Sequence, residues 1–483
     1  MPPEKSQKNK ERKYSKRVQY PSYSQNFFGV VSKYDYIVIF ILCLLAYNTT
    51  SLGGIVSGDT IPASYLPFSL ITYHTLNFDY ISDIVTQPEV DYAFPVVKGH
   101  TVSLFPIVTP VLITPIYFLW ITLYTFFGIP LTWMDIYMWA KVAASIITAL
   151  SCVFFYLTAK ELFKEKIAVI TTLIFAFATS TWSVSSQALW QHGMVELLLI
   201  LMFYIIIRNE KSDSIKNIIF LGLLSGLFIF NRPPDSILLI PIFAYILLYH
   251  RKQVLYYLVS AAASGLPFLL YNVMTFGNIF GGYDKNLSLF SLNVDFPVHM
   301  AGLLIAPNLG LLVFSPVLIL SIFGYLQLKR IQNQKIEKIL FIFGPVIIFQ
   351  IFIYGIFGAW ASSTAYSYGQ RFLTGFIPVL MIYVGLFLNE YFIPGTINKK
   401  TATVRAGIVL LVLVSVLIQA IGVFLYPYNP EKSTGEKDVW SLDNNIIVTS
   451  YVMGSERIEF IKLYITPPLP PLFQYQFKHS SAG

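Results

Sequence analysis

The sequence predicts an all-α polytopic membrane protein, and three observations support this fold class. Of the 483 residues, 55% are hydrophobic and only 12% are charged, whereas soluble chains carry about 25% charged residues. Apolar runs of about 20 residues recur between positions 35 and 427, and each is long enough to cross a hydrocarbon core of about 30 Å as a helix. The short alternating segments of a transmembrane β-barrel are absent from the sequence.

The basic residues orient the chain in the membrane. The net charge is +8, and the positive residues stand in short clusters between the apolar runs, as the positive-inside rule describes, so no nucleic-acid partner is expected. Residues 1–33 form a basic tail, and no cleavage site follows the first apolar run. We therefore expect a cytoplasmic N-terminus and an uncleaved first span at 36–55. Cys43 and Cys152 lie inside apolar runs, where neither a disulfide nor a metal site is expected.

The charge clusters also predict the topology. Twelve apolar segments follow one another, at about 36–55, 104–127, 136–158, 167–183, 192–207, 217–230, 236–249, 254–274, 301–327, 339–358, 372–391 and 406–427. If all of them crossed, the internal basic loops would lie outside, against the positive-inside rule. If segment 104–127 does not cross, every basic loop lies inside. Pro106, Pro110 and Pro115 give this segment a reason not to cross as a plain helix.

We therefore predict about 11 transmembrane helices in a domain at 34–427, with the C-terminus outside. The first outer loop, at about 56–135, would contain interfacial helices, and residues 428–483 would form a small extracytoplasmic segment. Pro307 and Pro316 predict a broken or kinked helix within 301–327. The short inner loops contain no glycine-rich phosphate loop, so any chemistry is expected on the outer face.

Asp59 is the first unusual polar residue of the outer loops. It follows the first span in the stretch Ser57-Gly58-Asp59-Thr60. A carboxylate just above the membrane is well placed to act as a general base on a substrate hydroxyl. The alternative is a helix cap, which Asp and Thr often provide before an apolar stretch.

Lys98 and His100 lead into the proline-containing segment of the same loop. Lys98 is a candidate ligand for a lipid phosphate, and His100 is included among the substrate-binding candidates. The alternative for Lys98 is that its side chain extends to the lipid headgroups.

Trp190 and His192 belong to a short outer turn, 185–193, that also contains Gln187 and Gln191. Aromatic and amide groups together suit the face of a sugar. Trp190 could instead be an anchor at the membrane interface. His192 is expected to form hydrogen bonds rather than to bind a metal, because no second ligand stands at a suitable spacing.

Arg232 and Arg371 are two arginines on the predicted outer face, against the charge bias. An arginine near hydrocarbon depth needs an anionic partner. For Arg232 this partner is either Asp235, in an internal ion pair, or a lipid phosphate. Arg371 stands among aromatic residues, and Tyr368 completes the substrate-binding candidates.

Taken in order, these motifs resemble the GT-C superfamily of membrane glycosyltransferases, in particular the branch of protein O-mannosyltransferases and the lipid A aminoarabinose transferase. The resemblance extends from the first span to about residue 390. It consists of an acidic residue after span one, a long first outer loop and a proline-containing helix after a Lys or His. A polar outer turn, an Arg after a glycine-containing span and the stretch Tyr-Gly-Gln-Arg-Phe-Leu at 368–373 follow.

The resemblance implies an inverting glycosyltransferase that moves a sugar from a polyprenyl-phosphate carrier to an acceptor hydroxyl on the extracytoplasmic face. It makes Asp59 the base, and Lys98, Arg232 and Arg371 candidates for the donor phosphate. Asp59 is followed by Thr60 instead of the Glu of the mannosyltransferase branch, which leaves the sugar and the acceptor open. The acidic metal-binding motifs of the oligosaccharyltransferase branch are not recognisable. We therefore expect no metal and no other cofactor, with the lipid-linked sugar as co-substrate.

The expected partners are a polyprenyl-phosphate sugar donor, a glycan, lipid or protein acceptor, and membrane lipids. The alternative function is a transporter or flippase of a lipid-linked glycan without covalent chemistry. Transporters often have inverted repeats and polar residues at the bilayer midplane, whereas here the polar residues gather at one face and no internal repeat is visible. A third alternative is a scaffold or polymer-binding subunit.

Overall fold

The computed structural model describes residues 28–50, 57–82, 91–362, 367–392, 399–426, 439–443, 445–452 and 454. This part of the chain is mostly helical, and its strands are β1 (Val96–Val97) and β2 (His100–Thr101), which pair antiparallel. The predicted all-α class is thereby confirmed. The basic tail predicted at 1–33 lies outside the described residues up to position 27, and helix α2 (Phe28–Asn48) already begins within its last residues.

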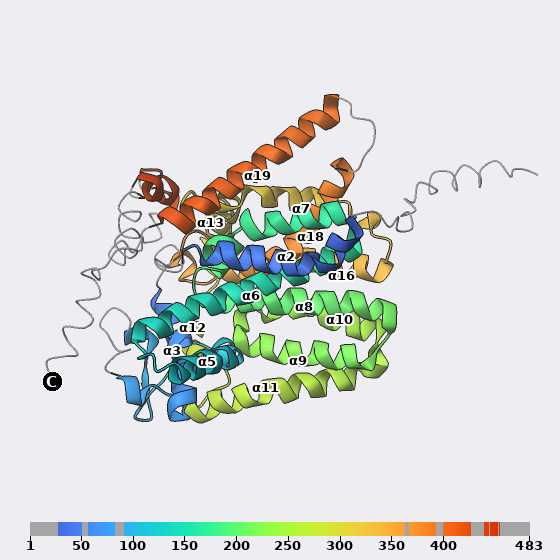
Figure 1. The fold of residues 1–483 in the computed structure, drawn as a ribbon. Helices are drawn as coiled ribbons and strands as arrows, with labels where there is room; N and C mark the ends of the chain where they lie inside the picture. The colour runs from blue at the N-terminus through green and yellow to red at the C-terminus, as the bar shows by residue number, and fades with distance from the viewer. Residues whose placement is uncertain are drawn as a thin grey trace, which may run out of the picture.

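A row of long helices forms one side of the bundle. Helices α2, α6 (Trp133–Leu162), α8 (Gln191–Ser212), α9 (Ile215–Asn231) and α11 (Val254–Phe276) run roughly parallel across the molecule (Figure 1). Neighbours in this row contact one another in the order α2, α6, α8, α9, α11. Helices that are not consecutive in the sequence, such as α6 and α8, therefore lie beside one another in the row.

The remaining helices pack onto this row. They are α7 (Glu165–Phe177), α10 (Ile240–Tyr249), α13 (Phe296–Ile305), α15 (Leu320–Tyr325), α16 (Gln334–Gly355), α18 (Ile377–Tyr391) and α19 (Lys399–Leu425). Helix α18 contacts α7, α8 and α15, while α16 contacts α10 and α13. Chain segments that are far apart in sequence thus share one helical core.

Small residues allow α9 and α11 to lie very close together. Gly222 and Gly226 are four residues apart on the face of α9 that meets α11, and a Cβ atom at either position would collide with the backbone carbonyl of Tyr257 or Ala261. Helix pairs in membranes often associate through such small residues, because lipid provides no hydrophobic driving force between helices. The close contact fixes the position of the end of α9, where Arg232 follows.

Seven of the described helices are long and apolar enough to cross a membrane. They are Val108–Phe126, Asp135–Leu162, Gln191–Ser212, Arg251–Phe276, Gln334–Gly355, Thr374–Tyr391 and Thr401–Leu425. Shorter apolar helices stand between them, such as Ile215–Asn231 and Pro233–Tyr249. The chain is an integral membrane protein, as the sequence predicts.

The prolines of segment 301–327 break the helix as predicted. Helix α13 ends at Ile305, α14 (Leu311–Phe314) and the 3₁₀-helix Pro316–Ile319 follow, and α15 continues the path. Asn308 lies in the break and donates to the carbonyl of Ser441. The described pieces of the predicted C-terminal segment 428–483 therefore pack onto this break; the rest of that segment lies outside the described residues.

Segment 104–127 differs from the prediction in one respect, because it forms one helix instead of several. Helix α5 (Val108–Phe126) contains Pro115 in its interior, while Pro106 precedes the helix and Pro110 lies in its first turn, where a missing N–H is tolerated. Near its start, Thr109 donates to Asn231 at the end of α9, and near its end, Tyr124 donates to Asp135 at the start of α6.

The two ends of α5 lie at the same end of the bundle. Lys141, near the start of α6, donates to the carbonyl of Ser186, just before α8, and Asn231 donates to the carbonyl of Gln191, at the start of α8. The start of α6, the start of α8 and the end of α9 are therefore neighbours. In Figure 1, α5 lies with α3 (Ile61–Tyr73) and α12 (Asp284–Leu287) at the left-hand end of the bundle. This position supports the prediction that segment 104–127 does not cross.

The position of α5 can be tested by cysteine labelling in intact membranes. Val96 precedes α5 and is 70% exposed, and Ile129 follows it and is 48% exposed. We expect V96C and I129C to react with a membrane-impermeant thiol reagent from the same side. The native Cys43 and Cys152 are buried and should give little background.

K252C provides the control for the opposite side, because Lys252 is exposed in the turn between α10 and α11. It should react only after the membrane is opened. If I129C reacts together with K252C and not with V96C, α5 crosses the membrane and the predicted topology is wrong.

Candidate active site

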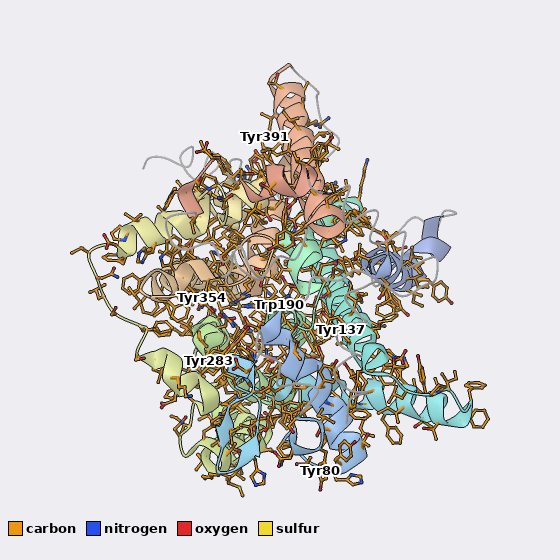
Figure 2. The ribbon with its side chains drawn as sticks, turned by 90° about the vertical axis from the view of Figure 1, so that its left-hand side faces the viewer. Tyr80, Tyr137, Trp190, Tyr283, Tyr354 and Tyr391 are labelled. Atoms are coloured by element: carbon orange, nitrogen blue, oxygen red, sulfur yellow. The ribbon has the colours of Figure 1, made fainter. Side chains whose placement is uncertain are left out.

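A cavity of about 320 Å³ opens at the end of the bundle where α5 lies. Figure 2 views this end and shows Trp190, Tyr283 and Tyr354 grouped near its centre. Five of the residues predicted from the sequence line the cavity, namely Asp59, Trp190, His192, Arg232 and Arg371. Most of the other lining side chains are apolar or aromatic, among them Leu104, Phe105, Leu189, Tyr283, Leu289, Phe290, Tyr354, Phe357 and Phe372.

Asp59 lies in the 3₁₀-turn Gly58–Thr60 that precedes α3. Its Oδ1 accepts a hydrogen bond of 2.7 Å from the Tyr92 hydroxyl, and its Oδ2 lies 2.8 Å from Arg371 Nη2. A Cβ atom at position 58 would collide with the Tyr92 hydroxyl, so Gly58 permits this approach. The described contacts of the carboxylate are with these two side chains and not with a helix end, and Thr60, the residue before α3, makes no side-chain cap bond either. The cap interpretation is therefore wrong.

Arg371 is held in place from several sides. The side chain of Gln370 accepts from the Phe372 backbone N–H, and Thr374 Oγ1 donates to the Arg371 carbonyl, so the backbone is fixed around it. The guanidinium carbon lies 4.7 Å from the ring centroid of Trp190 and 5.2 Å from that of Phe372. Such cation–π contacts are strongest in desolvated surroundings, and the Arg371 side chain is only 6% exposed.

Arg232 forms the second buried cation of the site. It ends α9, and the following Pro233 starts a separate 3₁₀-helix. Arg232 Nε lies 2.9 Å from Asp235 Oδ2, and Nη2 donates to the Tyr354 hydroxyl at 2.9 Å. Tyr354 in turn donates to Asp235 Oδ1 at 2.6 Å, and Gln350 donates to the same oxygen. The internal ion pair considered from the sequence is therefore present.

Phe372 brings the two arginines together. Its ring centroid lies 5.6 Å from the guanidinium carbon of Arg232 and 5.2 Å from that of Arg371. The ring is also stacked on Tyr354, with centroids 5.3 Å apart. Two positive groups thus face one cavity from the same aromatic wall.

Tyr283 connects Arg232 with the start of α8. Its hydroxyl donates to Gln191 Oε1 at 2.8 Å and accepts from Arg232 Nη1 at 3.4 Å. Burial raises the pKa of the Tyr283 hydroxyl, so the group remains a neutral phenol that can donate a proton to a hydrogen bond at physiological pH.

Trp190 and His192 both contribute to the cavity wall, but in different ways. Trp190 is buried against Arg371, so it is not exposed as an interface anchor would be. His192 is also buried, and its Nδ1 has no hydrogen-bond partner among the described residues. A buried nitrogen without a partner is uncommon, and here it belongs to a residue that lines the cavity.

Three of the predicted binding residues lie elsewhere. Lys98 is exposed and donates to the Met274 carbonyl, and it forms the hairpin turn between β1 and β2 together with Gly99, both with positive φ. His100 pairs with Asp79 at the surface. Tyr368 is buried, and its hydroxyl donates to the Ile418 carbonyl on α19. The structure thus gives these three residues other contacts and places them outside the cavity wall.

Tyr92, Tyr283, Tyr354 and Phe372 are site residues that the sequence reasoning missed. Each comes from a segment rich in aromatic residues, where the sequence pattern does not distinguish a tyrosine or phenylalanine of the site from its aromatic neighbours. The sequence signal that could have found Tyr283 is the preceding pair Gly281-Gly282, whose second residue lies against the backbone of Leu104. Within the described ranges, no group of three or more His, Cys, Asp and Glu side chains is arranged to hold a metal ion.

Comparisons with known proteins support the resemblance to the GT-C superfamily. The family model of dolichyl-phosphate-mannose-protein mannosyltransferase matches residues 115–271. No curated protein matches the chain by sequence. Among solved structures, ArnT from Cupriavidus metallidurans bound to undecaprenyl phosphate is similar over 90% of this chain and 78% of its own, with a TM-score of 0.51 and 12% identity.

A second similar structure is the oligosaccharyltransferase of Archaeoglobus fulgidus in its apo form. It matches 88% of this chain and 61% of its own length, with a TM-score of 0.50 and 11% identity. At such low identity the likeness concerns the fold. The chain therefore has a GT-C-type membrane fold, as the order of its motifs predicted.

The ion pair of Arg232 can be tested by unfolding of the purified protein in detergent. Asp235→Ala leaves a buried arginine without its carboxylate, and we expect a loss of about 3–5 kcal/mol in the free energy of unfolding. Tyr354→Phe removes a hydroxyl that bonds both charged groups and should cost about 1.5–3 kcal/mol.

The double variant Arg232→Met/Asp235→Leu serves as the control. Because it removes both charges, it should recover most of the lost stability. Equal stability of Asp235→Ala and the unmodified protein would mean that the pair does not neutralise Arg232.

Proposed function

We propose that the protein is an inverting glycosyltransferase that moves a sugar from a polyprenyl-phosphate carrier to an acceptor hydroxyl on the extracytoplasmic face. The observation that carries the proposal is the cavity itself, where the carboxylate of Asp59 and two buried arginines meet at one end of the bundle. The matched mannosyltransferase family model and the bound undecaprenyl phosphate of ArnT support a lipid-phosphate donor.

Asp59 is the proposed general base. It would take the proton of the acceptor hydroxyl while the hydroxyl oxygen forms a bond to the anomeric carbon. The bond between that carbon and the phosphate oxygen breaks at the same time, and polyprenyl phosphate leaves with the electron pair. The acceptor is the hydroxyl of a glycan, a lipid or a protein.

The arginines would stabilise the leaving group. Negative charge develops on the phosphate in the transition state, and preorganised cations in a site that excludes water stabilise it strongly. Arg232 and Arg371 are both buried and both face the cavity. His192, Tyr283 and Trp190 offer hydrogen-bonding and aromatic surface to the sugar.

A single displacement, which inverts the anomeric centre, fits the carboxylates that are present. Retention by double displacement, as in retaining glycosidases, needs a second carboxylate as nucleophile. Among the described residues that line the cavity, Asp59 is the only carboxylate. Asp235 is occupied by Arg232, Tyr354 and Gln350.

The charged ends of the helices support the extracytoplasmic position of the site. The basic residues Lys160, Lys211 and Lys335 lie at the end opposite the cavity, where Lys211 pairs with Glu161 and Lys335 with Glu210. By the positive-inside rule this end faces the cytoplasm. The cavity would then open on the other face, where lipid-linked sugars are used without a cytosolic nucleotide.

The role of Asp59 can be tested with the purified protein and polyprenyl-phosphate sugars. Loss of a general base typically slows catalysis by about 10²–10⁴-fold, and we expect this for Asp59→Asn. Asp284→Asn is the matched control, because Asp284 is an exposed carboxylate on the same end of the molecule, outside the cavity wall; its turnover should be unchanged. Full turnover of Asp59→Asn would remove it from the mechanism.

A further inference from the structure

We propose that the donor phosphate takes Arg371 away from Asp59, so that the base becomes available only when the lipid-linked donor is bound. This inference rests on the proposed function and adds a means of regulation to the same site. Arg371 Nη2 lies 2.8 Å from Asp59 Oδ2. Because this oxygen is paired with a cation, it is not free to receive the proton of an acceptor hydroxyl.

Arg371 is only partly satisfied by Asp59. Its Nη2 contacts the carboxylate, but its Nη1 is buried and has no hydrogen-bond partner among the described residues. An unsatisfied N–H of a buried cation is costly. A phosphate can bind both terminal nitrogens of a guanidinium at once, and such bidentate bonds are among the strongest in proteins. The phosphate therefore offers Arg371 more than the single contact with Asp59.

Other contacts keep both groups at the cavity wall while the guanidinium changes its partner. The faces of Trp190 and Phe372 hold the guanidinium independently of Asp59. Asp59 has a second anchor as well, because Tyr92 donates to its other oxygen at 2.7 Å. When Arg371 turns to the phosphate, Asp59 remains at the cavity wall with Oδ2 free for the acceptor.

The other arginine is held differently and is not expected to exchange. Asp235 accepts from Tyr354 and Gln350 in addition to its contact with Arg232. Asp235 is also fully enclosed, with 2% of its side chain exposed, against 17% for Asp59. Asp59 has the larger exposed fraction and one hydrogen bond besides its ion pair, against two for Asp235, so Asp59 is the carboxylate that can be released.

Control by the donor would have a chemical advantage. An unoccupied site would not activate water or an acceptor before a sugar is present. The two substrates would then act in order, with the lipid-linked donor first. Arg371 is in this sense a positioning residue for the base as well as a ligand of the phosphate.

The inference predicts an unusual property of Asp59→Asn, namely tighter binding of the lipid phosphate. The asparagine is neutral and no longer competes for Arg371. We expect purified Asp59→Asn protein to bind undecaprenyl phosphate in nanodiscs about tenfold more tightly than the unmodified protein, which corresponds to about 1.4 kcal/mol. The uncharged lipid undecaprenol should bind equally to both proteins. The same binding measurement with inorganic phosphate distinguishes the contribution of the headgroup from that of the lipid chain.

Asp284→Asn removes the same charge outside the cavity wall and controls for general electrostatics; its affinity should not change. Asp59→Asn that binds no more tightly than the unmodified protein, yet has lost turnover, overturns the exchange and leaves the proposed base in place. Asp59→Asn that retains turnover overturns the proposed function instead. Equal tightening in Asp284→Asn also overturns the exchange, because it assigns the effect to net charge. A thermal unfolding measurement on each variant verifies that it is folded.

Discussion

Two arginines are buried at one end of this helical bundle, and the need to neutralise them shapes the whole site. Moving an arginine out of water is unfavourable unless an anion and hydrogen bonds replace the water. Arg232 finds Asp235 three residues later, together with the hydroxyls of Tyr354 and Tyr283. Arg371 finds Asp59, more than 300 residues away in the chain. The second pair therefore joins the start of the membrane domain to its last third.

The rest of the bundle keeps these groups in position. The break after α9 presents Arg232 at the cavity, and the close contact of Gly222 and Gly226 with α11 fixes where that break lies. Phe372 and Trp190 cover the guanidinium groups with aromatic faces. Because helices and aromatic walls are rigid, the positions of the charges are set before any ligand binds, which is the condition for electrostatic stabilisation of a transition state.

The balance of charge in the cavity is also consistent with a base that is blocked before the donor binds and is released afterwards. Each arginine has a carboxylate of the protein as its partner, so both positive charges are compensated within the site. In the proposed exchange, a lipid phosphate brings a further negative charge and displaces the carboxylate that is held by fewer contacts. The two ion pairs differ in the way this proposal requires, since one is enclosed and the other is partly exposed.

The sequence by itself determined the fold class, the membrane location and five of the residues that line the cavity. These depend on composition, on apolar length and on charges in unfavourable places, all of which are local properties. The tertiary structure decided which outer residues meet. Lys98, an apparent phosphate ligand, forms a hairpin turn with Gly99, and Tyr368 packs against α19.

Four further site residues come from segments whose sequence patterns do not indicate a role in the site, namely Tyr92, Tyr283, Tyr354 and Phe372. The charge clusters predicted that the segment containing α5 stays at one end of the bundle. They did not predict that this segment forms a single, unbroken helix. The physical reason is that a pairing such as that of Asp59 with Arg371 depends on how distant helices pack, and the free energy of that packing is not encoded in any short stretch of residues.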